Sequence, residues 1–338
     1  MIIHKNIYSI LLIAIVLTGT FFLFGCSHFF QKTTNEKNHN YNSSNKNYKP
    51  GDYRETIVHD GLQRTYLIHI PKNYNENTTY PLLLSFHGGG GTAENQAKRG
   101  FSKKADTLAS QHKKSFIVVY PQGINNQWNH GRNVATTHEN IDDVGFVRTL
   151  IAHVQNTLPI DKKNIFANGM SSGGFFSYRL GCEMSDTFAG IAPVVSAMPK
   201  SLLNSCNANS VSLIAIQGTE DPIVPINGGD VKHKTLGIGK GGLTLSSQNT
   251  EKFWAKNNKC ERMPKTETLP SIMHDGTTVT KTTYTDCAQN TKIHFYRVGG
   301  MGHQWPPNEN RKKIAGPTSK NINATEVIVD FLMNKKSK

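Results

Sequence analysis

One serine in a glycine-rich segment has surroundings that indicate chemistry. Residues 168–174 read Asn-Gly-Met-Ser-Ser-Gly-Gly and contain a Gly-x-Ser-x-Gly pattern centred on Ser171. An apolar run ends just before the pattern, and a helical stretch over 175–180 follows it. A sharp turn between a strand and a helix holds a serine hydroxyl exposed for nucleophilic attack, and small flanking residues permit that turn. Ser171 is therefore the predicted nucleophile.

A serine hydroxyl is a weak nucleophile and needs a base, which an acid in turn orients. Asp221 follows the apolar run 211–216, and His303 follows the run 292–298. The order serine, acid, histidine is one of the known orders of a catalytic triad. We predict that His303 is the base and Asp221 its partner. Glu220 is the alternative acid.

A glycine run supplies candidate donors for a negatively charged intermediate. His87 and four glycines follow the apolar run 82–86, and backbone N–H groups of such a loop can stabilise an oxyanion. We expect the amides of Gly88, Gly89 and Ser172 to do so. A phosphate-binding loop is excluded, because no Gly-Lys-Ser/Thr follows the glycines. The expected chemistry is ester hydrolysis through an acyl-enzyme, without metal or organic cofactor.

The elements that must position these residues are short apolar runs alternating with helical patterns. Runs that are apolar on both faces are typical of parallel strands covered by helices. The sequence therefore predicts an α/β fold with a doubly wound, mostly parallel sheet, as in α/β-hydrolases, in a single domain over 51–338. Asp142 and Asp143 precede one helix, where carboxylates suit its N-terminus. Strands are expected at 64–70, 82–86, 116–120, 164–167, 189–195, 211–216 and 292–298, and helices at 144–158, 175–180 and 324–333.

The N-terminal 26 residues predict export. Lys5 precedes the apolar stretch 7–24, and residues 23–26 resemble a bacterial lipobox whose cysteine, Cys26, is lipidated and holds the protein at a membrane. The alternatives are an uncleaved membrane anchor and a signal peptide without lipid. All three place the rest of the chain outside the cytoplasm. Residues 27–50 are poor in aliphatic side chains and are the predicted disordered tether.

The four cysteines after Cys26 predict disulfides, because an even set in an exported chain favours pairing. Three connectivities are possible. We favour Cys182–Cys206 and Cys260–Cys287, since each closes a compact loop worth roughly 3 kcal/mol. The alternative leaves one pair as thiols. A metal site is not expected, because the cysteines show no metal-ligand spacing.

The net charge of the chain limits which kinds of partner are expected. The 338 residues include 38 Lys+Arg against 24 Asp+Glu, a formal net charge of +14. The basic residues are scattered, and none of their runs is interleaved with aromatics, so nucleic acid is not the expected partner. The excess favours an anionic membrane surface. The oligomeric state stays open.

These motifs together resemble a known family, the secreted poly(3-hydroxybutyrate) depolymerase and feruloyl esterase group related to carbohydrate esterase family one. The resemblance runs from about Gly51 to Leu332, and its most specific segments are 182–186 (Cys-Glu-Met-Ser-Asp) and 302–306 (Gly-His-Gln-Trp-Pro). It implies the triad Ser171–Asp221–His303 and both disulfides. Other matching segments are 81–91, 120–128, 142–146, 160–198 and 217–229.

Three aromatic or imidazole side chains are the expected substrate contacts. His87 belongs to the glycine loop, and the resemblance implies that Trp128 and Trp305 border the acyl pocket. Either tryptophan could instead belong to the core.

The chain departs from the family in three respects. Met301 interrupts the glycine run before His303, and Gln217 stands where the family often has His. No linker and polymer-binding domain follow the last expected helix, so soluble oligomers or small esters are the expected substrates. Two alternatives are a serine peptidase on the same fold and a non-catalytic, surface-binding lipoprotein.

Overall fold

A computed structural model of the chain describes residues 47–134, 140–206, 208, 210–232, 241–308 and 313–333. They belong to one compact unit, 44–338. The predicted lipidation site Cys26 and most of the predicted tether lie outside the described residues. Tyr48 is buried and meets the Tyr53 ring edge-on at 5.0 Å, so the packed domain begins a few residues before the expected boundary at 51. No helix among the described residues is long and apolar enough to cross a membrane.

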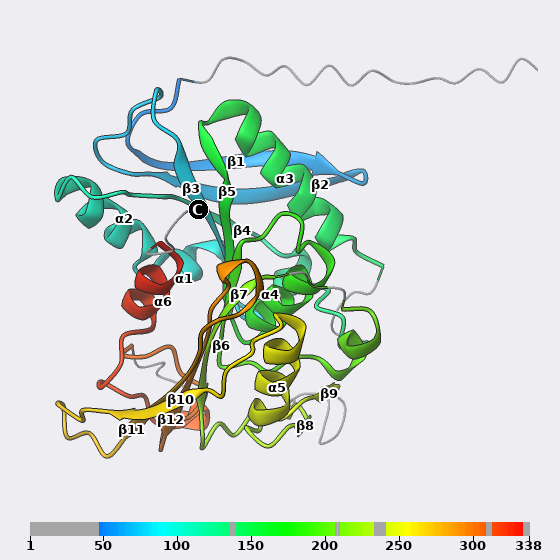
Figure 1. The fold of residues 1–338 in the computed structure, drawn as a ribbon. Coiled ribbons are helices and arrows are strands. Elements are labelled where there is room, and N and C mark those ends of the chain that lie inside the picture. Colours follow the sequence, from blue (N-terminus) through cyan, green and yellow to red (C-terminus); the bar gives the residue numbers. More distant parts are fainter. Residues whose placement is uncertain are drawn as a thin grey trace, which may run out of the picture. The chain divides into compact units, whose positions relative to one another are not determined.

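A ten-stranded sheet forms the centre of this unit (Figure 1). Six adjacent strands run parallel. The predicted mostly parallel sheet is confirmed. In spatial order the six are β4 (Ile117–Pro121), β3 (Tyr80–Phe86), β5 (Ile160–Met170), β6 (Gly190–Val194), β7 (Ser212–Gly218) and β12 (Ile293–Gly299).

The sheet has antiparallel margins. On one side β1 (Gly51–His59) and β2 (Leu62–Ile70) extend it, and on the other β11 (Thr278–Tyr284) and β10 (Lys265–Leu269). Only β2 among these was expected. The other three alternate or are mostly exposed, so they lack a continuous apolar run. A separate two-stranded sheet pairs β8 (Gly229–Asp230) with β9 (Leu243–Thr244).

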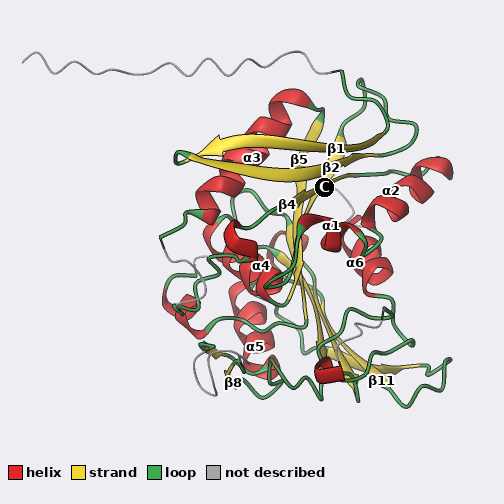
Figure 2. Cartoon of the chain, turned by 180° about the vertical axis from the view of Figure 1, so that it is seen from behind, coloured by secondary structure: helices red, strands yellow, loops and turns green. Residues whose placement is uncertain are grey.

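Helices cover both faces of the sheet, as a doubly wound fold requires. In β3, Leu83 packs into the core on one face while Leu82 and Leu84 pack into the core on the other. Figure 1 shows helices on both sides of the sheet, and Figure 2 shows the same division from behind. One set is α1 (Ala93–Ala97), α2 (Phe101–Ser110) and α6 (Ala324–Met333); the other is α3 (Asp143–Thr157), α4 (Ser172–Glu183) and α5 (Ser247–Asn257).

Both favoured disulfides are formed. Cys182, near the end of α4, bonds to Cys206, and Cys260, just after α5, bonds to Cys287 ahead of β12. Each bond therefore ties the end of a helix to a loop that precedes a sheet strand. The pairing chosen from the sequence is confirmed.

The strand register brings the site loops to one edge. Met170 of β5 pairs with Val194 of β6, Val194 with Ile216 of β7, and Ile216 with Tyr296 of β12. Parallel strands in this register end together, and the crevice outside their carboxyl ends is where α/β sheets bind ligands. Ser171, Asp221 and His303 all follow these strands.

Candidate active site

Ser171 occupies a strained turn between β5 and α4. Its backbone has φ 53° and ψ −114°, a region that non-glycine residues rarely adopt and that costs about 1–3 kcal/mol. Two hydrogen bonds hold it: the Ser171 N–H donates to Val194 O (2.9 Å), and the Phe175 N–H donates to Ser171 O (2.9 Å). The turn presents the serine at the N-terminus of α4, as predicted for a nucleophile.

The flanking glycines are required by close backbone approach. A Cβ at Gly169 would lie 2.3 Å from the carbonyl carbon of Gly173, and a Cβ at Gly173 would lie 2.3 Å from Phe86 O. No side chain fits at such distances. The Gly-x-Ser-x-Gly pattern therefore records how tightly β5, α4 and the end of β3 meet.

Asp221 and His303 form a buried pair. Nδ1 of His303 lies 2.7 Å from Asp221 Oδ2, and the two side chains are 8% and 2% exposed. The other carboxylate oxygen accepts the N–H groups of Ile223 (2.8 Å) and Val224 (2.9 Å). Because Nδ1 donates to the carboxylate, Nε2 is the nitrogen left to accept a proton. Glu220, the alternative acid, is exposed.

The structure joins acid and base by a hydrogen bond, but it does not join base and serine in the same way. Within the described part of the chain, no hydrogen bond involves Ser171 Oγ. Such contacts are often long without substrate and tighten when it binds. The nucleophilic role of Ser171 stays a prediction that the turn geometry supports.

The loop after β3 lies beside the serine. A Cβ at Gly88 would be 3.6 Å from Ser171 Cβ. The Gly90 N–H donates to Asn126 O (2.9 Å), whereas the amides of Gly88 and Gly89 have no partner among the described residues. Ser172 is the first residue of α4, where helix N–H groups are free. These three amides fit the predicted oxyanion role, which stays a prediction.

His87, an expected substrate contact, lies inside the protein, and its contact with substrate stays a prediction. The residue is 1% exposed. Nε2 accepts the N–H of Gly123 (3.0 Å), and Nδ1 lies 2.9 Å from Gly88 O, so the neutral ring carries its proton on Nδ1. Burial lowers the pKa of His87 to about 4. The ring fastens the glycine loop to the loop after β4.

The two tryptophans that are expected to border the acyl pocket are also fully buried, and that expected role stays a prediction. Trp128 stacks on Phe176 with ring centroids 5.2 Å apart, and its Nε1 donates to His87 O (3.0 Å). Trp305 donates through Nε1 to Thr325 Oγ1 (3.2 Å) at the start of α6. Trp128 therefore supports the glycine loop, and Trp305 supports the loop of His303.

Sequence reasoning missed a buried ion pair behind this site. Arg64 of β2 donates through Nη2 to Asp143 Oδ1 at 2.6 Å, and both residues are 1% exposed. Burial raises the pKa of Asp143, and the guanidinium opposes that rise. The helix cap is Asp142, which accepts the Gly145 N–H (2.8 Å). Two features of the sequence could have indicated this pair. An arginine stands at the start of an apolar strand, and two aspartates precede one helix although only one of them is needed to cap it.

Comparison with known proteins places this architecture in a family. The family described as "Putative esterase" matches residues 61–298, more than half of the chain. Putative esterase NocK from Nocardia uniformis subsp. tsuyamanensis is 26% identical over 288 residues, covering 83% of this chain and 82% of that protein. Probable feruloyl esterase C from Aspergillus niger is 29% identical over 174 residues, 51% of this chain and 60% of that protein.

A solved structure agrees on the fold. An acetyl xylan esterase from Aspergillus awamori superposes with a TM-score of 0.52, covering 83% of this chain and 99% of that chain at 12% sequence identity. At this identity the likeness concerns the fold alone. Taken with the family match, it shows that this chain belongs to the putative esterase family and is a carboxylic ester hydrolase of the α/β-hydrolase fold.

Proposed function

We propose that the chain is an exported serine carboxylic-ester hydrolase that works through an acyl-enzyme on Ser171. The observation that carries the proposal is the buried Asp221–His303 hydrogen bond of 2.7 Å. It occupies Nδ1 and leaves Nε2 as the base, at the sheet edge where the strained Ser171 turn also lies.

In the proposed mechanism, Ser171 Oγ attacks the ester carbonyl while His303 Nε2 takes its proton. Asp221 orients the imidazole and stabilises the imidazolium that forms. The amides of Gly88 or Gly89 and of Ser172 stabilise the oxyanion. His303 then protonates the departing alcohol, and water deprotonated by His303 attacks the acyl-enzyme. The bond between the acyl carbon and Ser171 Oγ breaks, the carboxylic acid leaves, and His303 returns the proton to Ser171 Oγ. The proposed steps use no metal or organic cofactor.

The proposed substrates are soluble esters. The likeness to feruloyl esterases supports aromatic acyl esters of sugars as one proposed class. The motifs that resemble those of poly(3-hydroxybutyrate) depolymerases support 3-hydroxybutyrate oligomers as a second proposed class. Short acyl esters are the third class. The alignment with feruloyl esterase B of Piromyces equi spans 42% of that protein. A feruloyl ester substrate for the present chain is therefore part of this proposal only.

Export is part of the same proposal. The apolar N-terminal stretch and the lipobox-like residues up to Cys26 would hold the enzyme at the outer side of a membrane. The two disulfides support an oxidising compartment, where such bonds persist. Radiolabelled palmitate should be incorporated into the wild-type protein and not into Cys26→Ala.

The catalytic proposal is tested with a fluorophosphonate probe and a panel of esters that differ in the acyl group. Wild-type protein should label and turn over, whereas Ser171→Ala should lose labelling and at least about 10⁴-fold in kcat. A serine peptidase would also hydrolyse matched peptide amides, which an esterase leaves intact. A non-catalytic binding protein would neither label nor hydrolyse, and either result would remove the esterase proposal.

A further inference from the structure

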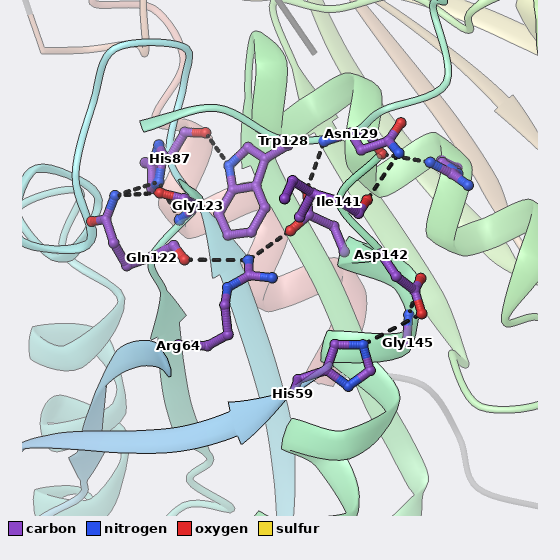
Figure 3. Close-up of polar contacts among 12 residues, drawn as sticks. His59, Arg64, His87, Gln122, Gly123, Trp128, Asn129, Ile141, Asp142 and Gly145 are labelled. Atoms are coloured by element: carbon purple, nitrogen blue, oxygen red, sulfur yellow. Dashed lines mark hydrogen bonds and ion pairs between the residues drawn. The ribbon is translucent and has the colours of Figure 1, made fainter. Parts of the chain in front are cut away.

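The segment 122–129 is fastened at both ends by the buried ion pair. At its start, Gln122 O accepts a long hydrogen bond from Arg64 Nη2 (3.5 Å). At its end, the Asn129 N–H donates to Asp143 Oδ2 (2.7 Å). Arg64 Nη2 also donates to Asp143 Oδ1 (2.6 Å), so the ion pair links the two ends of the segment. Figure 3 shows Arg64 pointing between Gln122 and Ile141, below Trp128.

Further contacts immobilise the end of the segment. Asn129 donates through Nδ2 to Ile141 O (3.0 Å), and Arg179 Nη1 donates to Asn129 O (2.8 Å). The Arg64 guanidinium lies 3.8 Å from the centroid of the Phe146 ring, so its flat face is covered as well. The ion pair is therefore enclosed by α3 and β2 and has one geometry.

The middle of the segment holds the glycine loop, residues 87–91, at three points. The Gly123 N–H donates to His87 Nε2 (3.0 Å), and Trp128 Nε1 donates to His87 O (3.0 Å). Asn126 O accepts the Gly90 N–H (2.9 Å). These bonds satisfy the groups on either side of Gly88 and Gly89. The two amides between them are the ones assigned to the oxyanion.

We propose that Arg64 and Asp143 are positioning residues for the oxyanion donors: they fix the segment 122–129, which fixes the glycine loop beside Ser171. This inference rests on the esterase function proposed above and deepens it. Neither side chain contacts reacting atoms, since both are buried against β2 and α3. Their effect reaches the reaction only through the placement of Gly88 and Gly89.

The physical reason is the narrow tolerance of oxyanion stabilisation. Donors act when they are preorganised at hydrogen-bond distance from the charge that develops in the transition state, and losing one costs about 10²–10³ in kcat. Interactions made only in the transition state lower kcat without raising KM when they are lost. A loosened glycine loop should therefore show a loss in kcat with little change in KM.

The test is Asp143→Asn in the full-length protein, measured with a soluble aryl ester. Asn keeps the shape and an oxygen for the Asn129 N–H but leaves Arg64 without its carboxylate. We expect kcat to fall by about 10- to 100-fold, with KM within about twofold of wild type. The rate of fluorophosphonate inactivation should fall in parallel, because that reaction develops the same charge on its oxygen.

Asp142→Asn is the matched control. It makes the same chemical change one residue earlier, where the side chain is 55% exposed and Asn still caps the helix. Its kcat should stay at the wild-type value. The thermal midpoint of both variants separates a change in the folded enzyme from loss of folded enzyme.

Trp128→Phe is a second variant that keeps the test decisive should Asp143→Asn fail to fold. Phenylalanine preserves the stacking on Phe176 but removes the donor to His87 O. It should lower kcat about tenfold at constant KM. Rates are compared per folded molecule at a temperature where the variant is native.

The outcomes separate the two proposals. A wild-type protein that neither labels nor hydrolyses esters overturns the proposed function itself. An active wild type, with folded Asp143→Asn and Trp128→Phe variants that retain its kcat, overturns only the positioning role. A loss seen in KM alone, or equally in Asp142→Asn, overturns it too.

Discussion

The two loops that carry the proposed chemistry are held in different ways. The Ser171 turn is held by backbone contacts with the sheet: its N–H donates to Val194 O, and Gly173 lies against the end of β3. The glycine loop has a backbone hydrogen bond of its own, from the Gly91 N–H to Gly88 O, and hydrogen bonds from the segment 122–129 hold it in place. That segment in turn depends on an ion pair between Arg64 and Asp143.

The difference indicates where mutations should act. A turn held by close backbone contacts needs small residues beside it, so its sequence pattern is short and recognisable. A loop held by hydrogen bonds from another loop depends on residues that carry no catalytic signature. Mutations far from the reacting atoms should therefore affect the glycine loop more than the serine turn.

The largest expected effect concerns the buried ion pair. Arg64→Met leaves the Asp143 carboxylate buried without a partner, and we expect a loss of about 3–5 kcal/mol in the free energy of unfolding. The double variant Arg64→Met/Asp143→Leu leaves no buried charge and should lose less than the single variant. Urea denaturation measures both. If the loss in the double variant equals the sum of the losses in Arg64→Met and Asp143→Leu, the two residues are not coupled, and the ion pair does not support the glycine loop as described.

The next effect is the pH dependence of His87. Its folded pKa of about 4 lies below the ordinary value of 6.5. Between these values the unfolded chain binds a proton that the folded chain refuses, so stability falls as pH falls from about 6.5 to about 4. The shift corresponds to at most about 3 kcal/mol.

The measurement for His87 is the free energy of unfolding at pH 7 and at pH 4. His87→Gln keeps an acceptor for the Gly123 N–H and removes the titration, so its stability should change less over this range. Other histidines, among them the half-buried His294, also have lowered pKa values and act equally in both proteins. Identical pH profiles of wild type and His87→Gln would show that protonation of His87 does not destabilise the folded protein.

A smaller effect tests the strain in the serine turn. Ser171→Gly accepts φ 53° without penalty, whereas Ser171→Ala keeps a Cβ there. Both variants lack the nucleophile, and the glycine variant should be more stable than the alanine variant by about 1–2 kcal/mol. Thermal unfolding of the two proteins measures the difference. Equal midpoints would mean that the turn stores no strain.

The smallest effect concerns the cap beside the ion pair. Asp142→Ala removes the acceptor for the Gly145 N–H and should cost about 1 kcal/mol in stability. Its kcat should not change, since Asp142 does not contact the segment 122–129. Denaturant unfolding and ester turnover on one preparation give both values. A drop in kcat as large as that of Asp143→Asn would count against a specific positioning role of the ion pair.

Much of the fold followed from apolar patterning. Strands β3, β4, β6 and β7 are buried along their whole length, so each appears as a continuous apolar run. Strand β5 is continuously buried only in its second half, and β12 contains half-buried polar side chains. Strands β1, β10 and β11 escaped because their side chains are half exposed. Helices α2 and α5 escaped because their buried residues are few among polar ones. The surroundings of His87, Trp128 and Trp305 could not be predicted, because residue type and motif do not reveal which way a side chain points.

The amino-acid sequence alone determined the order of chemical groups, since glycines next to Ser171 and carboxylate and imidazole after later strands are local signals of strand ends and sharp turns. Among three possible connectivities, it also favoured the two disulfide pairs that the structure shows, because each closes a short loop. Only the tertiary structure decided what holds the glycine loop in place. Arg64 and Asp143 are 79 residues apart, and a buried charge pair becomes visible only when packing excludes water from both partners.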